Sequence, residues 1–323
     1  MRGRLLGPLL AGLGSLALGA RLGAQAAPPP SSAAAELEAV AALVEKGQLE
    51  PAERRLRSVA ERFRSVRALL QLSRLQSDRG DHPGALASLD EARAIAPNSE
   101  DVLAAHAEAQ LATGSLLPAI STLEALTRLA PTGARYHHLR GVALLRAGDP
   151  AAAAESLLEA QRLEPDQPET LAALGTALVR GERYAEARTH LLRAASLSPD
   201  SVEALASLAE AEQGLGEGEA ALDHARRALA REDGHPTANL VVGMLLIEQE
   251  RYPEARDALE KAAAGDPASA KAEYQLSLVY ARLQDEARSR RHRERYQAAL
   301  EQAEQRVKEV RDWTGFSTGG MQR

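Results

Sequence analysis

The stretch RYAEARTHLL (residues 183–192) returns almost unchanged as RYPEARDALE (residues 251–260), 68 positions further along the chain. Half of that interval recurs elsewhere, because four prolines follow one another at a spacing of 34 residues and a fifth lies two such intervals later. These prolines are Pro97, Pro131, Pro165, Pro199 and Pro267. At the one position of this series without proline the residue is Asp233, and the nearest proline is Pro236. A unit of 34 residues is therefore repeated, and such a period decides the architecture.

Small residues recur at fixed places in this unit. Counted so that the proline lies near its end, the units begin at residues 66, 100, 134, 168, 202, 236 and 270. The eighth residue is always small: Ser73, Ala107, Gly141, Gly175, Ala209, Gly243 and Ser277. The twentieth is alanine until the last unit: Ala85, Ala119, Ala153, Ala187, Ala221, Ala255 and Ser289. Alanine and leucine, both strong helix formers, dominate the apolar residues, and strand patterns are missing. The sequence therefore predicts an all-α protein.

The unit that begins at residue 168 indicates how each repeat folds. Its apolar side chains form two helical stripes, first Leu171, Leu174 and Leu178, then Tyr184, Ala187, Leu191 and Ala194. Arg180-Gly181-Glu182 interrupts the pattern, and we expect Gly181 to give the first helix a left-handed cap. One helix pair cannot bury its apolar face alone, so neighbouring units must stack on one another.

The period and the small positions resemble the tetratricopeptide repeat, over about residues 33–303. The resemblance implies a right-handed α-solenoid of stacked antiparallel helix pairs, with about seven to eight repeats. We expect a degenerate first repeat over 33–65, a regular array over 66–303, an extension of a long C-terminal capping helix over 304–312, and a disordered tail over 313–323. Because Ser289, Arg293 and Tyr296 replace packing residues, the last helix is predicted to be a solvating cap.

Residues 1–26 have the features of an export signal. Two arginines precede an apolar run over 5–20, and Ala24 and Ala26 provide small residues for cleavage before Ala27. Residues 27–32 form a proline-rich linker. We expect a periplasmic or secreted protein without stable membrane insertion after cleavage. The alternative is a membrane tether formed by an uncleaved signal anchor, although Arg21 ends the apolar run short of the roughly 20 residues that span a bilayer.

The sequence offers no catalytic, cofactor-binding or metal-binding motif. Gly214-Leu215-Gly216-Glu217-Gly218 follows a helix rather than a strand and falls where every unit turns, so we interpret it as a turn. Adjacent histidines such as His137 and His138 point about 100° apart on a helix and are expected to be solvated. A net charge of −6 argues against nucleic acid as a partner. The basic run over 288–295 is interpreted as a solvated helix face, with contact to acidic lipid or protein as the alternative.

The resemblance implies that positions 2, 5, 9 and 12 of each unit line a concave groove. The candidate partner-binding residues at these positions are Arg74, Glu108, His138, Val142, Leu145, Leu240, Met244, Ile247, Tyr274 and Leu278. The apolar members near the C-terminus form a patch that a soluble protein seldom leaves without a partner. Two alternatives stay open: the C-terminal helix folds back over the patch, or the inside–outside assignment is shifted by one position.

Three functional hypotheses follow. The first is a non-catalytic exported scaffold that binds a protein or peptide ligand in the concave groove. The second is a regulatory or substrate-presenting subunit of an enzyme complex whose catalytic chain is separate. The third is weak self-association through an exposed end of the solenoid.

Overall fold

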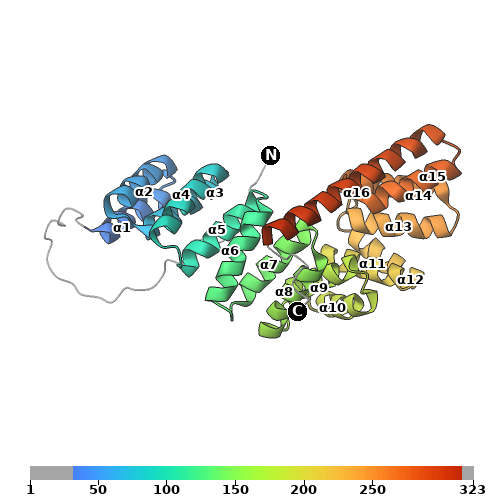
Figure 1. Ribbon diagram of the computed structural model, residues 1–323, viewed down its shortest axis with the longest axis horizontal. Helices are drawn as coiled ribbons and strands as arrows, with labels where there is room; N and C mark the ends of the chain where they lie inside the picture. Colours follow the sequence, from blue (N-terminus) through green and yellow to red (C-terminus); the bar gives the residue numbers. More distant parts are fainter. Residues whose placement is uncertain (1–31, 315–323) are drawn as a thin grey trace, which may run out of the picture.

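A computed structural model describes residues 32–314, and within this range the chain forms sixteen α-helices and no strand (Figure 1). Successive helices pack as antiparallel pairs, and the pairs stack along one long axis, so the predicted all-α solenoid is confirmed. The predicted signal peptide, nearly all of the linker and nearly all of the tail lie outside the described residues. No helix between residues 32 and 314 combines the length and the apolar character that crossing a bilayer requires.

The first helices of the pairs lie at regular intervals. They are α1 (Ala33–Glu45), α3 (Val66–Asp78), α5 (Glu100–Ala112), α7 (Ala134–Ala147), α9 (Pro168–Arg180), α11 (Val202–Gly214), α13 (Pro236–Glu248) and α15 (Ala270–Arg282). From α3 onward each begins at the residue where the sequence period starts a unit. The second helices are α2 (Leu49–Phe63), α4 (His82–Ile95), α6 (Leu116–Leu129), α8 (Pro150–Leu163), α10 (Tyr184–Leu197), α12 (Gly218–Leu229), α14 (Tyr252–Gly265) and α16 (Glu286–Thr314).

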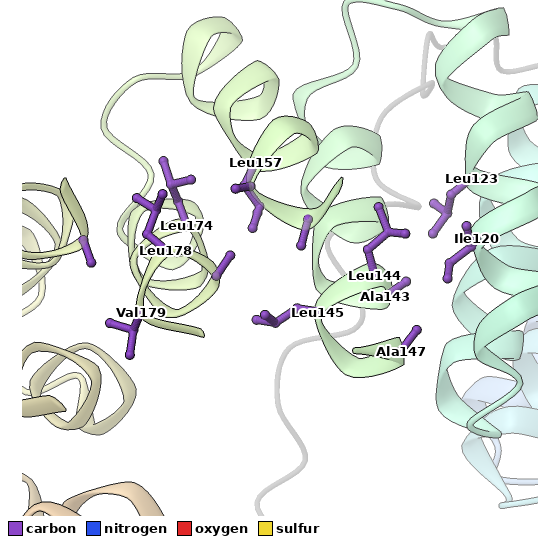
Figure 2. Close-up of a cluster of buried hydrophobic side chains, with 14 of the residues drawn as sticks. Ile120, Leu123, Ala143, Leu144, Leu145, Ala147, Leu157, Leu174, Leu178 and Val179 are labelled. Atoms are coloured by element: carbon purple, nitrogen blue, oxygen red, sulfur yellow. The ribbon is translucent and has the colours of Figure 1, made fainter. Parts of the chain in front are cut away.

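The small eighth residue of a unit lies where the two helices of a pair cross. A Cβ atom added to Gly175 would lie 2.3 Å from Cγ of Leu191, and one added to Gly141 would lie 2.4 Å from Cγ of Leu157. Glycine is required in these pairs because the opposing leucine fills the space that a side chain would take. Figure 2 shows the result, a core in which side chains from α6, α7, α8 and α9 meet.

The turn between the two helices has a left-handed residue at the fifteenth position of every unit from residue 66 onward. Glycine occupies four of these positions (Gly80, Gly114, Gly148 and Gly216), and the other three hold Glu182, Glu250 and Gln284. The expectation that Gly181 provides the left-handed cap is therefore wrong. Gly181 has a φ of −88°, whereas Glu182 has a φ of +58°. The turn fixes the position of the left-handed residue, and the glycine in this unit lies one residue too early.

Each copy of the repeated stretch, residues 183–192 and 251–260, forms the start of a second helix, α10 or α14. In both copies the arginine is the N-cap residue and pairs with a glutamate three residues later, Arg183 with Glu186 and Arg251 with Glu254. The tyrosine that follows packs inward. A Cβ atom added to Gly214 on α11 would lie 2.7 Å from the nearest carbon of the Tyr184 ring. The ring therefore fills the space between this repeat and the next.

The last pair departs from the predicted solvating cap. Ser289 is 1% exposed, and its hydroxyl donates a 2.9 Å hydrogen bond to the carbonyl of Ser277. Tyr296 is half-buried, and only Arg293 is exposed as expected. Polar residues on α16 can be buried because α15 offers them acceptors. The helix also runs to Thr314, two residues beyond its predicted end.

Candidate protein-binding surface

The predicted groove residues of the first units are polar, and most of them are paired. Arg74 is exposed on α3. Glu108 of α5 accepts a 2.7 Å hydrogen bond from Arg135 of α7, so position 9 of one repeat meets position 2 of the next. His138 is half-buried, and one ring nitrogen lies 3.0 Å from the hydroxyl of Thr170. Burial lowers the pKa of His138, and nearby Glu169 opposes this shift.

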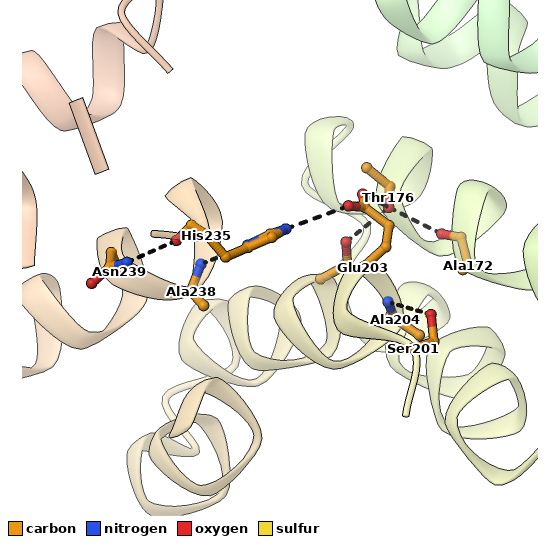
Figure 3. Close-up of polar contacts among 9 residues, drawn as sticks. Ala172, Thr176, Ser201, Glu203, Ala204, His235, Ala238 and Asn239 are labelled. Atoms are coloured by element: carbon orange, nitrogen blue, oxygen red, sulfur yellow. Dashed lines mark hydrogen bonds and ion pairs between the residues drawn. The ribbon is translucent and has the colours of Figure 1, made fainter. Parts of the chain in front are cut away.

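A second polar ladder continues along the middle repeats (Figure 3). The hydroxyl groups of Thr176 on α9 and Ser207 on α11 lie 2.8 Å apart. Glu203, on α11, has its Oε2 3.6 Å from Nε2 of His235, the N-cap residue of α13. The polar contact with His235 lowers the pKa of Glu203. Position 2 was expected to line the groove, but these partners could not be predicted, because pairing across repeats depends on the curvature of the array.

One ion pair reports that curvature directly. Lys271 on α15 lies 3.0 Å from Glu210 on α11, although α13 stands between these two helices in the stack. First helices two repeats apart approach this closely only on the inner side of a curved array. Positions 2 and 9 therefore point to the concave face.

Two of the predicted contact residues belong to the core rather than to the surface. Leu145 is 9% exposed and Leu240 is 6% exposed, and each packs in a cluster of buried side chains. Their helices turn these positions toward a neighbouring repeat, so we remove both from the candidate surface. Val142 is half-buried on α7, away from the C-terminal group.

The remaining apolar candidates form what we call the apolar patch, which consists of Met244, Ile247, Tyr274 and Leu278. Tyr274 and Leu278 on α15 are 42% and 41% exposed, and the two α13 residues are half-buried. The C-terminal helix contacts this patch through Tyr296, whose ring centroid lies 5.3 Å from that of Tyr274. It therefore covers part of Tyr274 and leaves Leu278 open.

The other motifs have structural roles. Gly216, in the glycine-rich run, is the left-handed residue of the turn between α11 and α12. One ring nitrogen of His137 lies 3.0 Å from the carbonyl oxygen of Pro131. Between residues 32 and 314, no group of three or more histidine and carboxylate side chains is arranged to hold a metal ion.

Comparison with known families agrees with the repeat geometry. Family models described as tetratricopeptide repeats match residues 37–100, 77–142, 134–167 and 172–238. The chain belongs to the tetratricopeptide repeat family. Proteins with this repeat are generally interaction scaffolds, and the stacked units supply an extended concave surface. No curated protein matches the chain.

Solved tetratricopeptide structures share this architecture. A tetratricopeptide repeat protein from Parabacteroides merdae is 16% identical, and the match covers 76% of this chain and 98% of that one, with a TM-score of 0.59. The APC/C hetero-tetramer Cut9–Hcn1 is 17% identical over 77% of this chain and 49% of the other, with a TM-score of 0.58. At these identities the likeness shows the fold alone.

Proposed function

We propose that this tetratricopeptide protein is a non-catalytic, exported scaffold that binds a protein or peptide ligand on the concave face of its array. The observation that carries the proposal is the exposure of Tyr274 and Leu278, two large apolar side chains one turn apart on α15. Burying such side chains against a ligand gains roughly 1.5–3 kcal/mol each before the costs of association.

The polar part of the groove supports the same assignment. Arg135, Glu203 and Lys271 each have a partner within the array, so a ligand would have to compete with existing ion pairs to bind there. Such exchanges contribute little net free energy. Leu278 of the apolar patch is exposed and needs no ion pair to be broken before a ligand covers it. We therefore assign the apolar patch the larger share of the binding free energy.

The test is crosslinking and mass spectrometry in cells that express the tagged chain, beside the variant Tyr274→Asp, Leu278→Asp. A matched control is Leu158→Asp, Leu192→Asp, because these leucines are 42% and 43% exposed and lie on second helices, α8 and α10. We expect one specific partner to be captured by the parent and by the control and to be lost from the patch variant. Equal capture by all three chains would contradict binding at the patch.

The identity of the captured partner separates the two functional hypotheses. A non-enzymatic protein or peptide favours the scaffold, whereas an enzyme that recurs in the captures favours the regulatory or substrate-presenting subunit. Export is tested separately by cell fractionation and by sequencing the N-terminus of the purified chain. Cleavage of the predicted signal gives a chain that begins at Ala27, and an intact start at Met1 in the membrane fraction gives the tethered form.

A further inference from the structure

Helix α16 is longer than the array needs. It has 29 residues, whereas the other second helices have 12 to 15. Its first half packs against α15 as the second helix of the last pair, and the rest continues beyond that pair toward the middle of the molecule (Figure 1). Most residues of this second half are exposed, including Glu304, Gln305 and Lys308.

The far end of α16 meets the array again at α6 and α7. Val310 is 4% exposed and belongs to the same buried cluster as Leu123 and Leu144. A methyl group of Val307 lies 3.7 Å from the position that a Cβ of Gly148 would occupy, at the end of α7. The contact joins the last repeat to repeats that begin more than 130 residues earlier, since α7 starts at residue 134 and α15 at residue 270.

We call the receiving surface the seat. It is formed by the start of α6 and the end of α7, and it borders a cavity of about 290 Å³ lined by Gly114, Leu116, Leu117, Pro118, Ala147, Arg306, Glu309 and Val310. The apolar side chains come from both helices of the array, and on α16 the two valines face them at a spacing of three residues. That spacing places both valines on one side of the helix.

The contact between α16 and the seat is small, although it joins segments that are far apart in the chain. Each repeat of a solenoid packs only against its neighbours, so the curvature of the array is the sum of many soft interfaces. A helix fixed at α15 and seated at α6 and α7 spans the intervening repeats and holds their curvature at one value. Because Val310 is the one buried residue, among those described, that the second half of α16 contributes to this contact, with Val307, Arg306 and Glu309 around it, the seated state is poised for release.

We propose that α16 is a strap. Its valine end binds the seat reversibly, and its release lets the repeats between α7 and α15 relax to a less curved arrangement. The seat is thus a binding site for the apolar end of a helix, and its resident ligand is α16 of the same chain. The consequence for ligand access to the groove rests on the proposed function, whereas the strap itself does not.

The strap is tested by a distance measurement on the full chain. The natural sequence has no cysteine, so Ser121→Cys on α6 and Glu304→Cys on α16, both at exposed positions, give two unique sites for spin labels. In the parent we expect one narrow distribution of distances between the labels. In the variant Val307→Asp, Val310→Asp we expect a broad distribution shifted to longer distances. An unchanged distribution in that variant overturns the proposal.

The matched control is Gln305→Asp, Lys308→Asp, which adds two carboxylates to the same turns at exposed positions and should leave the distances as in the parent. A shift in this control of the same size as in the valine variant overturns the proposal, because charge alone would then move the helix. A second measurement covers a valine variant that does not fold. A chain that ends at Ala303 should show a larger radius of gyration in X-ray scattering than the intact chain, although it is shorter; a smaller radius contradicts the strap.

Mixing identifies which chain occupies the seat. If excess unlabelled protein abolishes the short distance, the seat is filled by α16 of a second copy, and the intramolecular strap is overturned. A short distance that survives mixing supports it. None of these measurements uses a partner of the groove, so failure of the strap leaves the apolar patch proposal intact. Likewise, loss of capture by the patch variant with an unchanged label distance separates the two surfaces.

Discussion

In the repeat that begins at Pro168, helices α9 and α10 meet through apolar side chains and a glycine. Leu171, Leu178 and Leu191 are at most 1% exposed, and Gly175 lies directly beneath Leu191. The interface depends on shape, because each group fits only if its opposite leaves space.

In the last repeat, α15 and α16 place polar groups in the same region. Nδ1 of His292 lies 2.6 Å from a carboxylate oxygen of Glu273, and the two residues are 9% and 3% exposed. The imidazole stacks on the ring of Tyr280 at a centroid distance of 5.3 Å, and the hydroxyl of Tyr280 donates to Glu260. This interface depends on every polar group finding a partner.

One backbone therefore accommodates two kinds of core. Apolar filling suits a repeat with a neighbour on each side, because its apolar surface is covered twice. Among the described residues the last repeat has no pair beyond it, and hydrogen bonds beside the apolar residues Leu276 and Val279 keep α15 and α16 in register. Each kind of core should fail in its own way when one member is removed.

The largest effect is expected in the shape-dependent core. Leu191→Ala should lower the free energy of unfolding by about 2–5 kcal/mol, because it leaves a cavity above Gly175. Gly175→Ala should cost about 1–3 kcal/mol, because its methyl group would overlap Leu191. Together they should cost less than the sum, since the repeat from residue 202 places Ala209 and Ala225 at the same two positions. Urea unfolding of the four chains measures this coupling, and strict additivity would contradict the steric explanation.

The polar core should respond to the loss of one partner more than to the loss of both. His292→Leu leaves the carboxylate of Glu273 buried without its closest partner, and we expect a loss of roughly 2–3 kcal/mol. The value lies below that of a fully buried pair because Arg295 approaches the other carboxylate oxygen to 3.7 Å. The double variant Glu273→Leu, His292→Leu should be closer to the parent than the single variant is.

Thermal and urea unfolding of these variants provide the measurement. Arg295→Gln is the matched control, because it removes the outer charge and keeps the buried pair, and its effect should stay below about 1 kcal/mol. If the double variant is less stable than His292→Leu alone, the two side chains do not act as a pair, and the contrast between the two cores is lost.

A third prediction extends the comparison to a polar residue in a repeat with neighbours on both sides. His106 on α5 is 4% exposed; Nε2 lies 3.1 Å from Asp90, and Nδ1 has no hydrogen-bond partner among the described residues. Burial lowers the pKa of His106, with Asp90 opposing this shift and Arg93 adding to it. A lowered pKa means that the fold favours neutral histidine, so its contribution to stability is present above the unfolded pKa of about 6.5 and is lost as the pH falls below it.

His106→Gln should therefore reduce the loss of stability on going from neutral to mildly acidic pH. The difference between the unfolding free energies at about pH 7.5 and about pH 5.5 is the quantity to compare. It should be smaller in the variant than in the parent, though not zero, because burial also lowers the pKa of His138 and His190. An equal difference in both chains would show that His106 is neutral, or charged, in both states over this range.

The repeats with apolar cores were predictable because the constraint is local and periodic. A small eighth residue and an alanine at the twentieth position state that two helices cross closely, and Gly175 against Leu191 confirms it. The start of each first helix followed from the same period. The side chain that fills the space opposite each small residue comes from a fixed later position in the same unit. The close crossing of the two helices can therefore be predicted from one sequence.

The candidate surface was only partly predictable, because exposure depends on curvature. Leu145 and Leu240 share positions in the repeat with exposed residues elsewhere, and only the stacking of neighbouring helices buries them. The seating of Val310 at α6 and α7 depends on the summed rotation of the intervening repeats, which no single unit encodes. The burial of Ser289 escaped for a third reason: a serine at a packing position indicates exposure unless its acceptor, here the carbonyl of Ser277, is known.

The smallest effect tests the turn between α9 and α10, where the sequence and the structure disagree. Glu182→Gly should raise the free energy of unfolding by about 0.5–1 kcal/mol, because Glu182 has a φ of +58° and glycine adopts this region without strain. Gly181→Ala should be neutral or slightly stabilising, because Gly181 has a φ of −88° and an added Cβ would make ordinary contacts at 3.5 Å. If Gly181 were the left-handed residue, as its place in the sequence suggests, the alanine variant would instead lose stability. Chemical unfolding of the two single variants decides between the two positions, and the four turns that already have glycine at the fifteenth position give the reference for an unstrained turn.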